Sequence, residues 1–172
     1  MIMRPGQQLL LPANPLFIWF SLLAALVVNV LPLGRLAWQP DVLALVVVFW
    51  SVHQPQRVGI GAAFVFGLFM DVHQAALLGQ HALAYAALSF FAITIHRRLL
   101  WFSVPSQALQ VLPLFVAAHA IELALRMISG GSFPGLGILL APVIESLLWP
   151  IVSIILLAPQ RRAPDPDENR PI

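Results

Sequence analysis

The sequence lacks cysteine and lysine altogether, and charged residues of either sign are scarce. Without cysteine the chain forms no disulfides and offers neither a thiolate nucleophile nor a sulfur ligand for a metal. All nine basic residues are arginines, and charged residues make up only 9% of the chain. The sequence pI near 10.5 therefore reflects few charges rather than a basic surface, and we expect no binding of nucleic acid.

The common catalytic patterns are missing as well. The chain has no HExxH sequence, no phosphate-binding glycine loop and no supported arrangement of serine, histidine and aspartate. Its five histidines are scattered, and His73 and His81 are separated by a predicted turn rather than sharing one helical face. We therefore predict a protein that is not an enzyme and that has no cofactor and no metal site.

Hydrophobic residues, in contrast, make up 60% of the chain, and the mean hydropathy is +0.89. A soluble domain of average composition is far less apolar and more highly charged, so we expect a bilayer as the solvent. The predicted fold is all-α, a polytopic membrane helical bundle that forms one integral membrane domain over residues 1–157. No small-residue cleavage pattern follows the first apolar run, which we interpret as a retained span.

Six apolar runs are the candidate transmembrane helices. A span needs about 20 residues to cross a hydrocarbon layer of about 30 Å. Four runs have that length, but the second and third runs are short. The short pair either crosses with its polar ends included or forms a re-entrant pair buried among the other helices, and we prefer six crossings. In chain order the runs are 15–33, 42–52, 58–70, 77–95, 106–128 and 136–157.

The arginines predict the orientation in the membrane. With six spans, seven arginines fall on one side and two on the other. Because arginine and lysine are enriched in cytoplasmic segments, we expect both termini in the cytoplasm. The seven are Arg4, Arg57, Arg97, Arg98, Arg161, Arg162 and Arg170, and the two are Arg35 and Arg126.

Residues 158–172 differ in kind from the rest of the chain. Four prolines alternate there with arginines and carboxylates. A segment of this composition buries too little apolar surface to offset the entropy of ordering, so we predict a disordered cytoplasmic tail.

Small residues recur at every fourth position of the third run, at Gly59, Ala63 and Gly67. This spacing places them on one helix face and lets two helix backbones approach closely. The stripe predicts a close helix contact, either within the bundle or with a partner.

Asp71 lies one further step along the same stripe, at the predicted periplasmic edge. A lone carboxylate there needs water or a partner, and two roles stay open: capping of the following turn, or a contact with a partner protein. His81 and Tyr85 follow at the start of the fourth run and are i, i+4 neighbours. His81 either hydrogen-bonds to the nearby turn or serves as a proton relay.

The fifth run carries His119, Glu122 and Arg126 at i, i+3 and i+7, on one helix face. Such residues in a membrane face protein or water. They predict either an internally neutralised pair of Glu122 with Arg126, or a polar helix contact or transport path. Glu145 in the sixth run has no cation on its own helix, and Arg126 or His119 is its expected partner.

An ordered series of short sequences runs through the chain. The series is Pro40 and Asp41 before an aliphatic run to Phe49 and Trp50, QPQRVGIG at 54–61, FGLFMD at 66–71, LLGQHALAY at 77–85, and Trp149 with Pro150. In order and spacing it resembles the MreD family of rod shape-determining proteins from Gram-negative bacteria. The resemblance covers essentially the whole chain and is strongest from residue 40 to 85. The proline-rich tail and an N-terminal extension depart from the family pattern.

The resemblance implies a six-helix protein of the bacterial cell inner membrane that belongs to the rod complex, or elongasome. The implied function is a non-enzymatic scaffold that binds MreC and helps to position or regulate peptidoglycan synthesis, and so rod cell shape. Further implied partners are the actin-like MreB, the glycosyltransferase RodA and a class B penicillin-binding protein, with membrane lipid around them. The resemblance assigns no catalytic residue.

The family is also similar in architecture to the substrate-binding S-components of energy-coupling-factor (ECF) vitamin transporters. This similarity supplies an alternative hypothesis, a membrane transporter subunit that binds a small molecule or lipid. It predicts a periplasm-facing cavity lined by Asp71, His81, Glu122 and Glu145.

Overall fold

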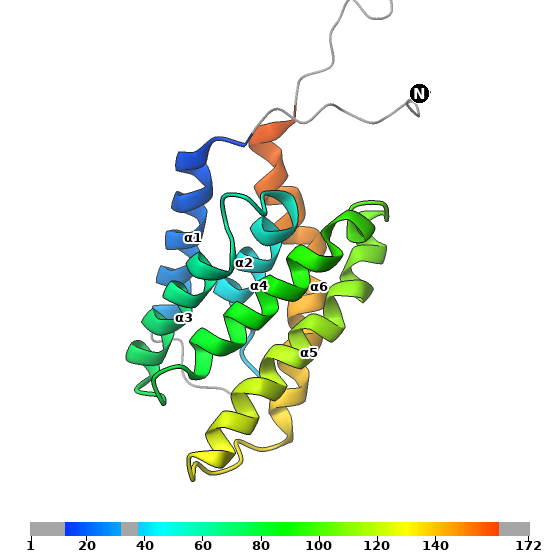
Figure 1. Ribbon diagram of the computed structural model, residues 1–172. Coiled ribbons are helices and arrows are strands. Elements are labelled where there is room, and N and C mark those ends of the chain that lie inside the picture. Colours follow the sequence, from blue (N-terminus) through cyan, green and yellow to red (C-terminus); the bar gives the residue numbers. More distant parts are fainter. Residues whose placement is uncertain (1–12, 32–37, 162–172) are drawn as a thin grey trace, which may run out of the picture.

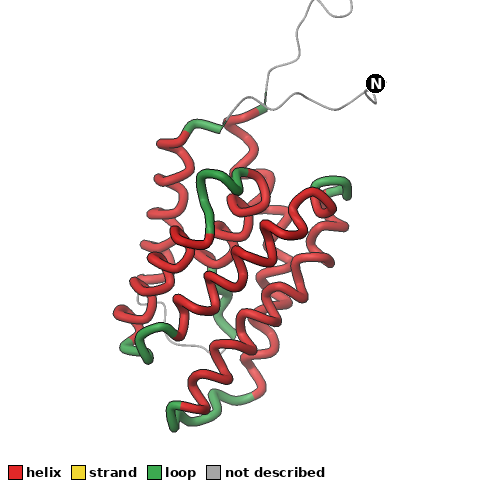
Figure 2. Tube along the Cα trace, viewed as in Figure 1, coloured by secondary structure: helices red, strands yellow, loops and turns green. Residues whose placement is uncertain are grey.

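The computed structural model describes residues 13–31 and 38–161, and within these ranges every regular element is helical (Figures 1 and 2). The predicted all-helical fold is confirmed for this part of the chain. Two short 3₁₀ helices, η1 (Leu136–Leu139) and η2 (Ala158–Gln160), flank the last α-helix. The α-helices are α1 (Pro15–Val30), α2 (Val42–His53), α3 (Ile60–Gln74), α4 (Gln80–Leu99), α5 (Val104–Ile128) and α6 (Leu140–Leu157).

Each of the six predicted runs overlaps one of these helices. Helix α4 is displaced at both ends: it begins at Gln80 rather than 77, because the residues before it form a turn, and it continues to Leu99 rather than 95. Two helical segments, Val104–Ile128 and Leu136–Gln160, are each long and apolar enough to cross a membrane by themselves. Six crossings remain a prediction.

Successive helices run in opposite directions. The beginning of α1 and the end of α6 lie at the same end of the bundle, together with the loops 54–59 and 100–103 (Figure 1). We call this the terminal end. The loops 75–79 and 129–135 lie at the other end, which we call the distal end. In the predicted orientation the terminal end faces the cytoplasm and the distal end faces the periplasm.

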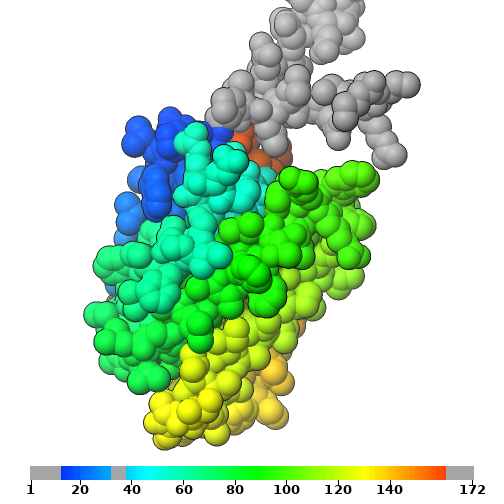
Figure 3. All heavy atoms as spheres, in the orientation of Figure 1, coloured from blue at the N-terminus to red at the C-terminus, as the bar shows by residue number. Residues whose placement is uncertain are grey.

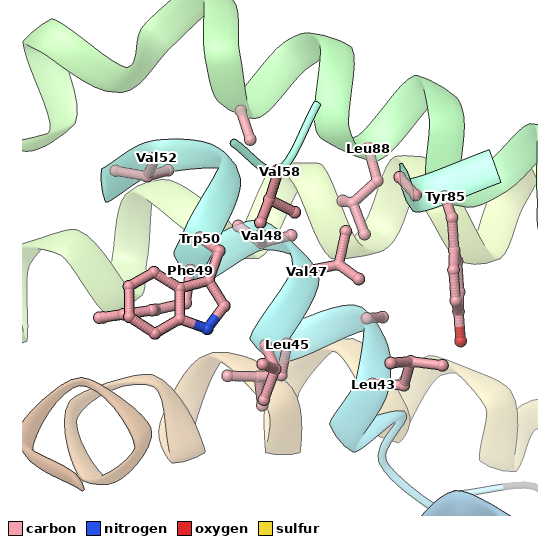
Figure 4. Close-up of a cluster of buried hydrophobic side chains, with 14 of the residues drawn as sticks. Leu43, Leu45, Val47, Val48, Phe49, Trp50, Val52, Val58, Tyr85 and Leu88 are labelled. Atoms are coloured by element: carbon pink, nitrogen blue, oxygen red, sulfur yellow. The ribbon is translucent and has the colours of Figure 1, made fainter. Parts of the chain in front are cut away.

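Helix α2 forms the centre of the bundle. All residues from Leu43 to Val52 are buried, and their side chains leave the helix in every direction (Figure 4). The helix packs against α1, α4 and α6. A helix that is apolar all round buries its whole circumference. Its 12 residues span only about 18 Å, a length that suits a helix surrounded by protein rather than lipid.

Buried hydrogen bonds attach α2 to its neighbours. The Trp50 indole Nε1 donates to Ser21 Oγ on α1 at 2.8 Å, and Ser51 Oγ lies 2.9 Å from Ser89 Oγ on α4. Because these polar groups are buried, leaving one of them without its partner would lower the free energy of unfolding by about 1–3 kcal/mol. The bonds therefore fix the register of α2 against both helices.

The outer surface is formed by the remaining helices, with α3, α4 and α5 covering the face in Figure 3. Large hydrophobic side chains are exposed along it, including Phe64, Phe69 and Leu109. On a soluble protein such a continuous apolar surface would drive association. Here it suits contact with lipid or with helices of other proteins.

The predicted boundary at residue 158 falls within the helical structure. Residues Ala158–Gln160 extend α6 as η2, and buried Gln160 donates from Nε2 to the Leu156 carbonyl oxygen at 3.3 Å. The remainder of the predicted tail, residues 162–172, lies outside the described residues, as do four of the nine arginines. Those four are Arg4, Arg35, Arg162 and Arg170.

Candidate functional site

Asp41 is the hub of a polar network toward the distal end. Its carboxylate caps α2 by accepting from Ala44 N at 2.9 Å. It also accepts hydrogen bonds from Asn29 Nδ2 on α1, at 2.6 Å, and from the Tyr85 hydroxyl on α4. Asn29 Oδ1 in turn accepts from Val42 N at 3.1 Å. A charged acceptor with several donors is a strong local anchor, so Asp41 holds three helices together.

Glu145 extends this network to α5 and α6. Its Oε1 accepts from the backbone N of Asp41 at 2.8 Å and lies 3.0 Å from His119 Nε2. The other ring nitrogen of His119 lies 3.5 Å from Glu122 Oε2. Glu145 is completely buried, and its Oε2 has no hydrogen-bond partner among the described residues. His119 therefore lies between two carboxylates, one buried and one at the surface of a cavity.

Asp71 forms a separate cap for α4. Its two oxygens accept from the backbone N of Gly79 at 2.8 Å and of His81 at 2.7 Å. The same carboxylate lies 2.8 Å from His81 Nδ1. Gly79 itself has a φ of +102°, a left-handed conformation that glycine adopts without strain. Asp71, near the end of α3, and His81, in the first turn of α4, therefore lie on either side of the turn that joins the two helices.

A cavity of about 890 Å³ opens between the helices at the distal end. Its lining combines carboxylates with histidines and one arginine, drawn from the ends of several helices. Among the lining residues are Asn29, Asp41, His81, His119, Glu122 and Arg126. Polar side chains that converge from different elements on one concave space are typical of a ligand site.

The four residues predicted to line such a cavity divide into two pairs. His81 and Glu122 line it, whereas Asp71 and Glu145 lie behind the lining and hydrogen-bond to it. Tyr85 is also fully buried, with its ring 6.3 Å from the His81 ring. The cavity is therefore supported by a buried layer of charged and polar side chains.

Arg126 lies at the cavity but not in the predicted pair with Glu122. Within the described ranges, Glu122 pairs with His119, and Arg126 is exposed near the end of α5. Its Cγ would be 2.8 Å from a Cβ placed at Gly131, so the side chain runs beside the loop that follows α5. The partner of Glu122 is thus His119, one turn earlier on α5, which also contacts Glu145 on α6.

The small-residue stripe of α3 approaches the beginning of α4 at Gly67. Ala63 and Gly67 are buried, and a Cβ at Gly67 would lie 2.4 Å from Ala82 Cα and 2.6 Å from Ala82 N. Gly59, which precedes the helix, would place a Cβ at an ordinary 3.7 Å from the Pro55 carbonyl oxygen. The close approach at Gly67 is therefore internal to the bundle.

Sequence reasoning missed the central role of Asp41 and Asn29. The signal for Asp41 was present, because an aspartate directly before a long aliphatic run is a typical N-cap. Its other partners come from α1 and α4, and the sequence contains no local pattern that pairs them. Asn29 stands alone in an apolar helix, which is a weaker indication of a buried contact.

Comparison with known proteins identifies the family. The family model described as rod shape-determining protein MreD matches residues 12–160 of the chain. A similar protein is the "Rod shape-determining protein MreD" of Haemophilus influenzae, which is 25% identical over 154 residues, an alignment that covers 84% of this chain and 93% of that protein. No solved structure matches the chain, so the similarity to transporter S-components remains a prediction.

The family match includes all the described helices and the whole polar network at the distal end. Membership implies a membrane protein with a role in determining rod shape, and MreD is not a known enzyme family. The chain belongs to the MreD family of rod shape-determining proteins.

Proposed function

We propose that this chain is a non-enzymatic scaffold of the cell-elongation complex, which binds MreC and helps to position or regulate peptidoglycan synthesis. The observation that carries the proposal is the family match over residues 12–160. The proposal includes six crossings of the inner membrane with both termini in the cytoplasm. It also includes MreB, RodA and a class B penicillin-binding protein as members of the same complex.

The shape of the bundle supports binding through helix faces. The loops 54–59, 75–79, 100–103 and 129–135 are short, so within the described ranges no extramembrane domain is available to a partner. Helix α1 exposes large side chains at i, i+4, i+7 and i+11, a spacing that forms one continuous stripe. These are Leu16, Phe20, Leu23 and Val27.

Helix α6 exposes a comparable stripe, which includes Leu147 and Ile151. In a membrane, lipid covers apolar surface as well as protein does, so helix association depends on close packing rather than on apolarity alone. We expect MreC to pack against one of these two stripes and lipid to cover the other.

Co-purification of MreC with paired variants tests this proposal. One variant carries Phe20→Ala and Leu23→Ala on α1, and a second, matched variant carries Leu147→Ala and Ile151→Ala on α6. Because all four side chains are exposed, both variants should fold. We expect one pair to lose MreC and the other to retain it. Full retention by both pairs, and by the two combined, would contradict binding through these faces.

The distal cavity supports a second candidate function, the binding of a small molecule or lipid. Its volume of about 890 Å³ falls in the range of ligand pockets. Mass spectrometry of the intact purified protein tests this candidate function by detecting small molecules or lipids that stay bound to it. Glu122→Gln should lower their occupancy, whereas Arg57→Gln at the terminal end should not. A protein that retains no molecule, even after incubation with total membrane lipid, would remove this candidate.

A further inference from the structure

The described charges separate toward opposite ends of the bundle. All four carboxylates of the described ranges lie toward the distal end, at Asp41, Asp71, Glu122 and Glu145. Within the same ranges, the terminal end carries arginines but no carboxylate. These arginines are Arg57, Arg97, Arg98 and Arg161. The terminal end is therefore a positively charged surface.

Two of these arginines lie beside exposed aromatic rings at the turn between α4 and α5. Arg97 and Arg98 are exposed in the last turn of α4. Trp101 is 90% exposed and Phe102 is 44% exposed. Together the four side chains line a surface hollow of about 540 Å³. A nearly fully exposed tryptophan is unusual unless its ring has a partner outside the protein.

The beginning of α5 adds to the positive potential at this turn. Its N-cap residue, Ser103, makes no side-chain hydrogen bond to the helix backbone and instead bonds to Ser106 Oγ at 3.0 Å. The first-turn N–H groups of a helix carry a partial positive charge and attract anions. This helix end follows directly after Phe102, so it reinforces the attraction of the two arginines.

We propose that Arg97, Arg98, Trp101 and Phe102 bind the headgroup of an anionic phospholipid. The guanidinium groups hold the phosphodiester, since arginine matches phosphate geometry. The two aromatic rings pack against the glycerol and the upper acyl chain, because indole prefers the interface between water and hydrocarbon. A soluble anion would leave these rings exposed, so the aromatic half of the surface favours a lipid.

The predicted orientation places this turn at the cytoplasmic leaflet, whose anionic lipids attract basic segments. The surface is at the terminal end, away from the distal cavity and its polar network. The inference therefore goes beyond the proposed scaffold function, and each can fail without the other.

Fluorescence quenching by brominated lipids tests the proposal on the full chain. The purified protein is placed in mixed micelles with increasing amounts of dibrominated phosphatidylglycerol, or of dibrominated phosphatidylcholine as the zwitterionic comparison. The contribution of Trp101 is the difference between the wild type and Trp101→Phe. We expect this contribution to be quenched at a lower mole fraction of the anionic lipid than of the zwitterionic lipid.

The variants separate a specific site from general charge. The double variant Arg97→Gln with Arg98→Gln should bind the anionic lipid more weakly. Each lost arginine should raise the mole fraction of anionic lipid needed for half-quenching by about five-fold, the factor that corresponds to about 1 kcal/mol. The matched control, Arg57→Gln with Arg161→Gln, removes two exposed charges from the same end of the bundle. It should change the mole fraction for half-quenching by less than about two-fold. Arg97→Lys with Arg98→Lys keeps the charge but loses the planar fork that matches phosphate, so it should raise this mole fraction by less than the glutamine pair does.

Three results would overturn the proposal. The first is equal quenching of Trp101 by the two lipids, which would leave the surface to a protein partner. The second is an equal loss of preference in the control pair. The third is displacement of the anionic lipid by inorganic phosphate at matched ionic strength, which would indicate a soluble anion. If the glutamine pair unfolds in a thermal scan, the lysine pair and a salt titration of the wild type decide the question.

Discussion

Replacing Gly67 by alanine tests how closely α3 and α4 approach. The added Cβ would lie 2.4 Å from Ala82 Cα, 2.6 Å from Ala82 N and 2.7 Å from the His81 carbonyl carbon. All three are backbone atoms of α4, which cannot rotate away as a side chain can. Overpacking of this kind costs about 1–3 kcal/mol, and we take about 3 kcal/mol because the obstacle is backbone.

A gain in helix propensity offsets part of this cost. Alanine is about 1 kcal/mol more favourable than glycine inside a helix, so we expect Gly67→Ala to lower the free energy of unfolding by about 2 kcal/mol. For a protein of this size, that lowers the melting temperature by about 4–8 °C. The assay is thermal unfolding of the detergent-purified protein, followed by loss of helical circular dichroism.

Gly61→Ala is the matched control on the same helix. A Cβ at Gly61 meets no atom within 4 Å, so only the propensity gain applies, and we expect a stabilisation of up to about 1 kcal/mol. The two variants should thus differ by about 3 kcal/mol. A Gly67→Ala protein as stable as Gly61→Ala would refute the close internal contact and return the small-residue stripe to contact with a partner.

Further variants test three polar anchors, at Asp71, Asp41 and Ser51, by the same unfolding assay. Asp71→Ala should cost about 2–4 kcal/mol because it uncaps α4 and leaves buried donors unpaired; a loss below about 0.5 kcal/mol would contradict its capping role. Asp41→Ala should lower the free energy of unfolding by a similar amount. Tyr85→Phe removes only one donor to Asp41 and should lower it by about 1 kcal/mol. Equal losses in the two variants would argue against Asp41 as the hub. Ser51→Ala should lower the free energy of unfolding by about 1–2 kcal/mol. Adding Ser89→Ala should restore part of this loss because no unpaired hydroxyl remains. Fully additive losses would show that the two serines are not coupled.

The helices were largely predictable from the sequence because the apolar runs in this chain are clearly separated by polar residues, glycine and proline. The central position of α2 was only partly predictable. Its run of residues 42–52 has no polar face until Ser51, which indicates burial on all sides, yet the run alone could not distinguish a short crossing from a re-entrant helix. Packing against α1, α4 and α6 decides its surroundings, and such contacts are not encoded locally.

The sequence predicted most of the residues of the polar site, but it predicted less well which of them contact one another. His119 was one of two expected partners for Glu145, and it is the one that hydrogen-bonds to it. The spacing of Glu122 and Arg126 allowed an ion pair that the structure does not form in the described ranges, where Glu122 pairs with His119 instead. Spacing shows which side chains can meet along a helix, whereas contacts across helices decide which of them do.

The most direct test of the proposed scaffold function is the shape of rod-shaped cells as this chain is depleted. We expect the cells to become round while nutrient uptake is unchanged, and the wild-type chain to restore rods. Unchanged uptake separates a role in wall elongation from a role in transport. Cells that remain rods after complete depletion would contradict the proposed scaffold function.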